Sequence, residues 1–197
     1  SIRYKIRNQK TLKELAIYLL TNIGKRFTYN SIKKNFKLGS INSVISFISY
    51  FEDTYMIFTI PQFDYSLKKM IVNPKKVYSI DNGFTLKNSA SFFDDKGRLL
   101  ENLVFINLRK KNNDMFYFQE NNECDFLIRE GTKIVKAFQV CYEINEDSKD
   151  REINGLVEAM SKFKLKEGII LTYNQEDSFE VDDKKIKLIP VWKWLLS

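Results

Sequence analysis

The sequence predicts an α/β chain, α+β overall, built in two parts that meet near residue 80. Three observations carry this expectation. Residues 11–51 place apolar side chains at helical spacing in three short stretches, and residues 55–72 change to a β-rich composition. The rest of the chain alternates in the order helix, three strands, helix, strand, which is typical of a mixed sheet with flanking helices. We therefore expect one domain over residues 1–80 and a second over residues 81–197.

The composition narrows the chemistry of this 197-residue chain. With 44% hydrophobic and 14% aromatic residues it can build packed cores. No signal-peptide pattern is present, and the longest early apolar run, residues 16–20, is too short to cross a bilayer; we expect a cytoplasmic protein with no membrane partner. The chain has no histidine, which excludes Ser-His and Cys-His catalysis. Hydrolytic chemistry would then depend on carboxylates, amides and lysines with a hard metal such as Mg²⁺.

Three helices are predicted in the first part. Thr11 opens a capping-box pattern, so the first helix is expected to begin there and run to about residue 23. A second helix fits residues 29–36, and Ser40 is expected to cap a third over residues 41–51.

Two strands are expected to follow, over residues 55–63 and 67–72. Three helices and two strands make a winged helix-turn-helix, a fold that often places its third helix in the major groove of DNA.

Charge supports a polyanionic partner for the first part. Residues 1–80 hold 14 basic and 4 acidic side chains, a net charge of +10, whereas residues 81–197 carry −3. We predict that DNA is contacted by the lysines of the second helix and of the wing, and by polar residues of the third helix (Lys33, Lys34, Lys37, Lys68, Lys69, Asn42, Ser43 and Ser46). This set favours phosphate contacts over base readout. A lysine-rich solubilising surface and a winged helix that contacts protein are the alternatives.

The second part continues the expected order of elements. Residues 75–83 read as a strand that ends in a turn. A helix over residues 97–111 is followed by strands over 115–119, 124–129 and 133–142. A helix through residues 153–163 and strands over 168–172 and 186–191 complete the series.

The candidate chemistry lies on the second and third of these strands. Period-two alternation lets Asp125 and Gln139 converge if the two strands pair as a hairpin, with Glu101 of the preceding helix nearby. Two carboxylates, an amide oxygen and the carbonyl of Val140 would make an all-oxygen site suited to Mg²⁺ or Mn²⁺. Such a metal lowers the pKa of a bound water and stabilises charge on a phosphate under attack.

These residues carry a family resemblance. Three phrases of the second part resemble the core of the PD-(D/E)XK nucleases, a restriction-endonuclease-like fold: Glu101-Asn102, Glu-Cys-Asp125-Phe-Leu-Ile and Ala-Phe-Gln139-Val-Cys141-Tyr. They resemble in particular the C-terminal domain of many prokaryotic and archaeal AAA-type ATPases. Two phrases of the first part resemble the winged-helix linker of those ATPases: Arg3-Tyr4-Lys-Ile-Arg and Pro74-Lys-Lys-Val-Tyr-Ser-Ile-Asp81-Asn-Gly83.

The resemblance implies Glu101, Asp125 and Gln139 as catalytic residues and metal ligands of a metal-dependent deoxyribonuclease. It also implies that the site is degenerate. Where the family carries Glu-x-Lys, this chain carries Gln139-Val140-Cys141, and cysteine cannot replace the lysine that positions the water. A lysine relocated to the later helix, Lys162 for instance, could complete the site.

Two hypotheses of different classes follow. The leading one is a DNA-engaging C-terminal module of an AAA-type ATPase. No GxxxxGK[ST] pattern is present, so we expect no nucleotide site in this chain and an ATPase domain before Ser1. The alternative is a non-enzymatic scaffold for protein interaction or oligomerisation. An open acidic cleft at Asp125 and Gln139 would favour catalysis, and a filled one would favour the scaffold.

Overall fold

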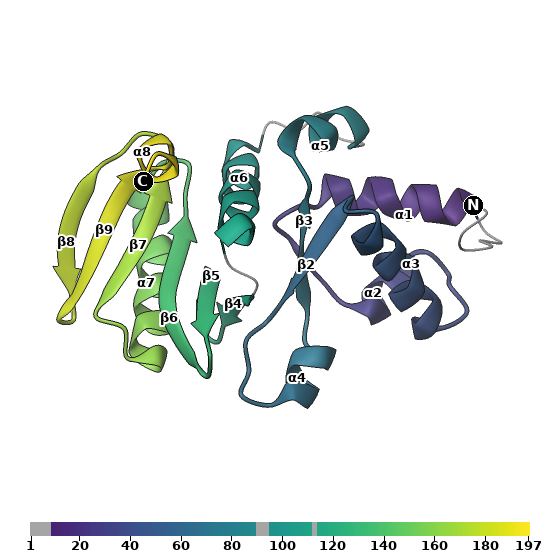
Figure 1. Cartoon of the computed structure of the whole chain (residues 1–197), viewed down its shortest axis with the longest axis horizontal. Helices are drawn as coiled ribbons and strands as arrows, with labels where there is room; N and C mark the ends of the chain where they lie inside the picture. Colours follow the sequence, from purple (N-terminus) through teal and green to yellow (C-terminus); the bar gives the residue numbers. More distant parts are fainter. Residues whose placement is uncertain (1–8, 90–94, 112–113) are drawn as a thin grey trace. The chain divides into compact units, whose positions relative to one another are not determined.

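The computed structural model describes residues 9–89, 95–111 and 114–197, and has a mixed α+β architecture (Figure 1). It divides into two compact units. The first consists of Ser1–Thr59 and Pro74–Asp94, and the second of Ile60–Asn73 and Asp95–Ser197. The Arg3-Tyr4-Lys-Ile-Arg phrase lies outside the described residues. The domain boundary expected between residues 80 and 81 stays a prediction.

The first unit contains four helices among its described residues and a three-stranded sheet in the order β1-β3-β2. In chain order its elements are α1 (Gln9–Thr21), β1 (Arg26–Phe27), α2 (Tyr29–Asn35), α3 (Ile41–Asp53), β2 (Ile57–Pro61), β3 (Lys75–Ser79) and α5 (Asn82–Asn88). The last two residues of β2 are counted with the second unit. One core joins α1, α2 and α3 through buried residues that include Leu19, Ile32 and Ile48.

Side-chain caps explain where two of these helices begin. Thr28 Oγ1 accepts from the Ser31 N–H at 3.0 Å, and Ser31 Oγ accepts from the Thr28 N–H at 3.2 Å, so α2 opens with a reciprocal capping box. Ser40 caps α3 without the reciprocal bond: its Oγ accepts from the Ser43 N–H at 3.1 Å. The start predicted for the first helix is wrong, because α1 already includes Gln9 and Thr11 lies inside it.

The second strand of the predicted wing is also wrong. Leu67–Val72 forms the short helix α4, which begins after Ser66 and belongs to the second unit. Asp64 Oδ1 accepts from the Ser66 N–H at 2.8 Å, and Ser66 Oγ accepts from the Lys69 N–H at 3.4 Å, so local side chains start a helical turn. Similarly, the turn expected at residue 83 is the start of α5, which Asp81 caps.

The second unit is built on a six-stranded mixed sheet in the order β4-β5-β6-β7-β9-β8. Its elements after α4 are α6 (Lys96–Lys111), β4 (Met115–Gln119), β5 (Glu123–Glu130), β6 (Lys133–Val140), α7 (Glu146–Phe163), β7 (Glu167–Thr172), β8 (Asp177–Val181), β9 (Lys184–Pro190) and α8 (Val191–Leu195). Strands β4, β5 and β6 are antiparallel neighbours, whereas β6, β7 and β9 run parallel.

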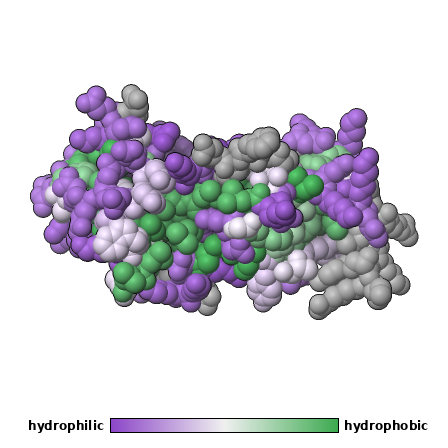
Figure 2. All heavy atoms as spheres, turned by 90° about the horizontal axis from the view of Figure 1, so that it is seen from above, coloured by the Kyte–Doolittle hydropathy of each residue, from purple (hydrophilic) through white to green (hydrophobic). Residues whose placement is uncertain are grey.

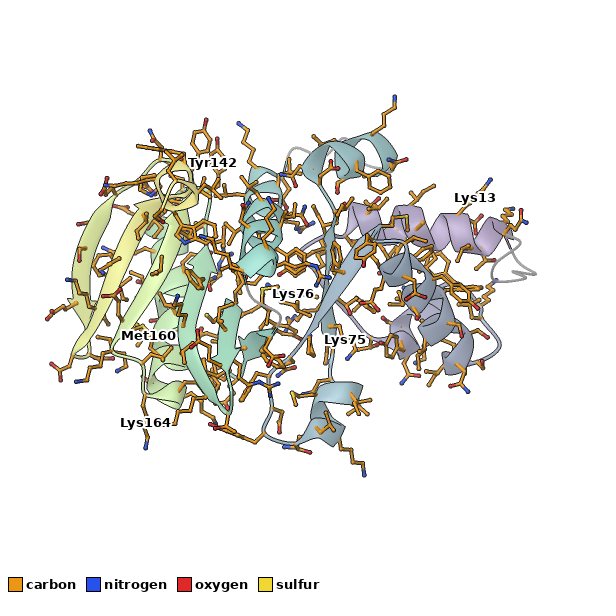
Figure 3. All side chains as sticks on the ribbon, viewed as in Figure 1. Lys13, Lys75, Lys76, Tyr142, Met160 and Lys164 are labelled. Atoms are coloured by element: carbon orange, nitrogen blue, oxygen red, sulfur yellow. The ribbon has the colours of Figure 1, made fainter. Side chains whose placement is uncertain are left out.

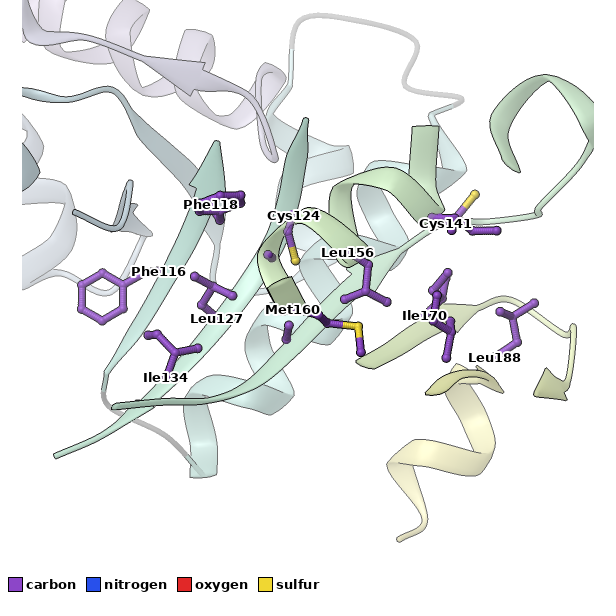
Figure 4. Packing of buried hydrophobic residues seen from close by; sticks show 14 residues of the cluster. Phe116, Phe118, Cys124, Leu127, Ile134, Cys141, Leu156, Met160, Ile170 and Leu188 are labelled. Carbon is purple, nitrogen blue, oxygen red and sulfur yellow. The ribbon is translucent and has the colours of Figure 1, made fainter. Parts of the chain in front are cut away.

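Helix α7 packs against this sheet over a shared apolar core (Figure 4). Leu156 and Met160 of the helix meet Leu127 and Ile170 of the strands in one buried cluster. Gly155 allows close approach, because a Cβ at this position would lie 2.0 Å from the Glu123 carbonyl oxygen of β5. Among the described residues, no helix has the length and apolar character needed to cross a membrane.

Candidate functional site

The candidate site lies where the pairing of β5 with β6 ends. Phe126 faces Phe138 and Leu127 faces Ala137 across the two strands, and the same register places Asp125 opposite Gln139. The Asp125 N–H donates to Gln139 Oε1 at 3.1 Å, and the Val140 N–H donates to Asp125 Oδ2 at 2.9 Å. The convergence expected for Asp125 and Gln139 is therefore present, and each side chain accepts from the backbone of the opposite strand.

A third buried residue, Glu152 of α7, completes the network. Gln139 Nε2 donates to Glu152 Oε2 at 2.6 Å, and Arg151 Nε donates to Glu152 Oε1 at 3.0 Å. The hydrogen bond and the charge of Glu152 raise the pKa of Arg151. Sequence reasoning missed Glu152. Its signal is its spacing, because it precedes Leu156 by four residues and so occupies one position of the apolar face of the helix.

Burial makes this network a closed one. Asp125 is 5% exposed, Gln139 6% and Glu152 4%. Buried polar groups of this kind are costly unless they are hydrogen-bonded, and here the side chains are joined in a chain that ends at Arg151. Among the described residues, the side chains of Asp125, Gln139 and Glu152 are thus almost fully covered.

Glu101 lies on a different element. It belongs to α6, where it is buried at 9% exposure next to the fully buried Asn102.

Oxygen atoms that a divalent cation would use are hydrogen-bonded within the protein. In residues 9–89, 95–111 and 114–197 no group of three or more Asp, Glu or Cys side chains is placed to hold a metal ion. Asp125 Oδ2 and Gln139 Oε1 already accept backbone N–H bonds. A cation at this position would share these oxygen atoms with the backbone N–H groups, and Mg²⁺ demands near-ideal octahedral geometry.

Neither Cys141 nor Lys162 supplies the missing cationic group. The Cys141 thiol donates to the Glu143 carbonyl at 3.0 Å, and burial, followed by the charge of Glu152, raises its pKa, so it stays neutral at neutral pH. Cys124 and Cys141 are both free thiols. Lys162 Nζ donates to Glu120 Oε1 at 2.7 Å. It follows Glu152 by ten residues, about 15 Å along a helix, so it does not complete the site.

The predicted DNA-binding residues fall on both units. In the first unit, Lys34 and Lys37 of α2 and its C-terminal turn are exposed and Lys33 is partly exposed, and none of the three forms an ion pair within the described part of the chain. Asn42 of α3 is exposed, whereas Ser43 is partly buried and its hydroxyl meets that of Ser40 at 3.0 Å.

The remaining members of the set differ in surroundings. Ser46 is partly buried on α3. Lys68 and Lys69 are exposed on α4 of the second unit, and Lys69 lies 3.5 Å from Asp64. The lysines of a predicted wing are therefore not part of a strand. Figure 2 shows that hydrophilic and hydrophobic side chains are both exposed on the face that it draws.

Comparison with known proteins identifies two family models along the chain. Residues 3–91 match the Domain of unknown function (DUF8612), and residues 96–194 match the Domain of unknown function (DUF4143). An uncharacterized protein of Methanocaldococcus jannaschii is 37% identical over 211 aligned positions, which cover 99% of this chain and 46% of that protein. The chain thus spans about half the length of this curated relative. No solved structure matches the chain.

Proposed function

The chain belongs to the family of the Domain of unknown function DUF4143, and from that premise we propose that it is a DNA-engaging, non-cleaving module of an AAA-type ATPase. The first unit would hold the DNA backbone, and the second would keep a restriction-endonuclease-like fold whose catalytic site has become a structural network. The observation that carries the DNA role is the set of exposed lysines on α2 and its C-terminal turn without ion-pair partners among the described residues.

The order of elements supports both parts of this proposal. Helices α1, α2 and α3 together with a three-stranded sheet, in which β1 pairs antiparallel with β3, suit a winged helix. In the second unit, α6, three antiparallel strands, α7 and the parallel strand β7 follow in the order expected for a nuclease-like core. Because a fold does not determine a function, the proposal also depends on the exposed lysines of the first unit and on the Asp125 network of the second.

Charge supports phosphate binding through the first unit. Lys34 and Lys37 are exposed, and within residues 9–89 neither is neutralised by a neighbouring carboxylate. Polyanion binding releases counterions when such cations meet phosphates, which supplies affinity without base-specific contacts. Asn42 at the start of α3 adds a hydrogen-bonding side chain beside the capped end of that helix.

The closed network argues against cleavage. A nuclease of this class needs carboxylate and carbonyl oxygens free for a metal and a cation to steady the scissile phosphate. Here the acceptors are used inside the protein, and the position of the lysine holds a neutral thiol. Arg151 is cationic, but its guanidinium is tied to Glu152 and cannot act as a base.

The ATPase association is supported by family context. The DUF4143 family is commonly found alongside AAA ATPase domains. The relative from Methanocaldococcus jannaschii is about twice as long as the aligned region, which leaves room for such a domain in a longer protein. We therefore propose the ATPase domain for a longer protein that would contain this chain.

A salt titration of duplex DNA binding tests the DNA role. Replacing Lys33, Lys34 and Lys37 by alanine should weaken binding and reduce the slope of log K against log salt by about 0.9 for each phosphate that the protein no longer neutralises. The matched control replaces the β9 lysines Lys184, Lys185 and Lys187, which should leave the slope unchanged. If DNA binding by the parent does not weaken as the salt concentration rises, the DNA role fails and the scaffold hypothesis replaces it.

Cleavage is tested separately on supercoiled and branched DNA with Mg²⁺ or Mn²⁺. We expect no metal-dependent products from the parent or from Asp125→Ala, while both proteins keep salt-sensitive binding. Cleavage by the parent that disappears in Asp125→Ala would contradict the non-cleaving part of the proposal and would show that the network opens to admit a metal.

A further inference from the structure

We propose that the second unit binds unpaired nucleic acid at a basic and aromatic pocket far along α7 from the Asp125 network. The pocket has a volume of about 190 Å³ and is lined by residues of the segment before α4, the β5–β6 turn and the end of α7 (Phe63, Tyr65, Thr132, Lys133, Ile134, Lys162, Phe163 and Lys164). This inference rests on the proposed DNA function and adds a second contact of a different kind.

Three lysines give the pocket its charge. Lys133 follows the tight turn at Gly131, whose φ is +60°, and Lys164 ends α7 with a φ of 57°. Figure 3 shows Lys164 extending away from the ribbon. Lys162 is partly neutralised by Glu120, but Lys133 and Lys164 form no ion pair with any residue that the structure describes. The pocket therefore offers two cations to an anionic ligand.

An aromatic series holds an exposed ring beside these cations. Tyr65 is 76% exposed, and its ring lies 5.3 Å from that of Phe63. Phe63 packs at 5.0 Å from Phe163, which in turn lies 5.6 Å from the buried Phe118. Edge-to-face contacts of this kind hold rings in fixed positions. Tyr65 is thus a surface ring anchored, ring by ring, to the core of the unit.

The size and chemistry of the pocket select the ligand class. Sites for free small molecules occupy roughly 300–1,000 Å³, so this pocket suits one unit of a chain that continues outside it. A lysine pair beside an exposed aromatic ring is the combination by which proteins bind single strands, with phosphates on the cations and a base stacked on the ring. Duplex DNA hides the faces of its bases, and an acidic peptide would need only the cations.

Binding at the pocket is tested by measuring the affinity of the full chain for a fluorescent oligothymidylate and for a duplex of the same length. Tyr65→Ala should weaken oligothymidylate binding about five- to hundredfold, because stacking of one base contributes about 1–3 kcal/mol. Tyr65→Phe keeps the ring and should retain most of the affinity. Tyr173→Ala is the matched control, since Tyr173 is 54% exposed on the same unit.

Salt dependence tests the cations. Lys133→Ala combined with Lys164→Ala should reduce the salt slope for oligothymidylate by about 1.4, because each phosphate contact on a single strand contributes about 0.7. The same pair should leave the duplex slope, which we assign to α2, unchanged.

The outcomes separate this inference from the proposed function. If Tyr65→Ala binds oligothymidylate as tightly as the parent, while the α2 lysine variant still loses duplex binding, the pocket is not a nucleic-acid site and the proposed function stands. The inference would also be overturned if polyglutamate bound to the pocket and Tyr65→Ala still bound oligothymidylate as tightly as the parent. The ligand would then be an acidic peptide. If the parent binds neither form of DNA, both proposals fail.

Discussion

Where β5 and β6 part, side-chain oxygens of Asp125 and Gln139 take the place of backbone carbonyls as acceptors. The exchange stabilises the end of the ladder, because buried N–H groups are costly when they are left without partners. It also uses acceptor sites on the oxygen atoms that a metal would bind, so a cation at this position would share those atoms with the backbone N–H groups.

Glu152 should therefore contribute to stability. Glu152→Ala removes the acceptor of Gln139 Nε2, which is buried, and should lower the free energy of unfolding of the second unit by about 1–3 kcal/mol. Urea unfolding followed by intrinsic fluorescence measures the change. Asp150→Ala, at an exposed position of the same helix, is the control and should change stability by no more than about 0.5 kcal/mol. Equal effects from both substitutions would mean that Gln139 finds another partner.

How much of the site the sequence reveals depends on how local the contact is. Asp125 and Gln139 are 14 residues apart on consecutive strands, and period-two alternation is sufficient to predict that they converge. Glu152 belongs to a helix that packs across the sheet, and the rotation of that helix is set by its contact at Gly155. No periodicity within the strands carries that information.

Elements follow the sequence where a cap or a period marks them. Helix α3 begins after its predicted cap Ser40, α2 begins at the predicted residue 29, and β4, β5 and β6 lie within two residues of the ranges expected. The sequence does not predict strand β8, because most of its residues are exposed and it therefore lacks an apolar pattern. For α4 the error is in type, since six residues are too few to distinguish a helical from a strand period.

The close packing of α7 against β5 at Gly155 gives a prediction for the stability of the second unit. Glycine in a helix is normally replaced by alanine with a gain of about 1 kcal/mol. Gly155→Ala should instead destabilise the second unit, since the added Cβ would lie 2.0 Å from the Glu123 carbonyl oxygen. Thermal unfolding measures the difference against Gly39→Ala, where no atom lies within 4 Å of the added Cβ. A gain in stability at Gly155 would show that α7 shifts freely on the sheet.

At the scale of the whole molecule, the second unit is discontinuous in sequence. Ile60–Asn73 precedes β3 in the chain but belongs with Asp95–Ser197. The Phe63 N–H donates to the Tyr117 carbonyl at 2.8 Å, and Gln62 forms a bridge with Tyr117, so this segment covers the outer edge of β4. Composition and periodicity are local along the chain, so they carry no information on a segment that packs with residues much further along the sequence.

A fragment of residues 95–197 should consequently be impaired. It lacks Phe63, whose ring packs against Phe116 at 5.4 Å and against Phe163 at 5.0 Å, and it exposes the β4 edge. We expect it to bind a hydrophobic dye and to unfold at lower urea than a fragment of residues 60–197. Light scattering should show association of the shorter fragment. Equal midpoints and equal dye binding would mean that residues 60–73 add nothing to the fold of this unit.

Amide hydrogen exchange can report on the site, because the backbone N–H groups of Asp125 and Val140 are bonded to side chains. The rotation of a single side chain releases the amide of Asp125 or of Val140 while β5 and β6 stay paired. The amides of the ladder, in contrast, exchange with deuterium only when the strands separate, and native-state exchange distinguishes such local openings from global ones. The exchange rates of the Asp125 and Val140 amides therefore measure how often this hydrogen-bond network opens locally. A ligand that enters the network should first change those two rates.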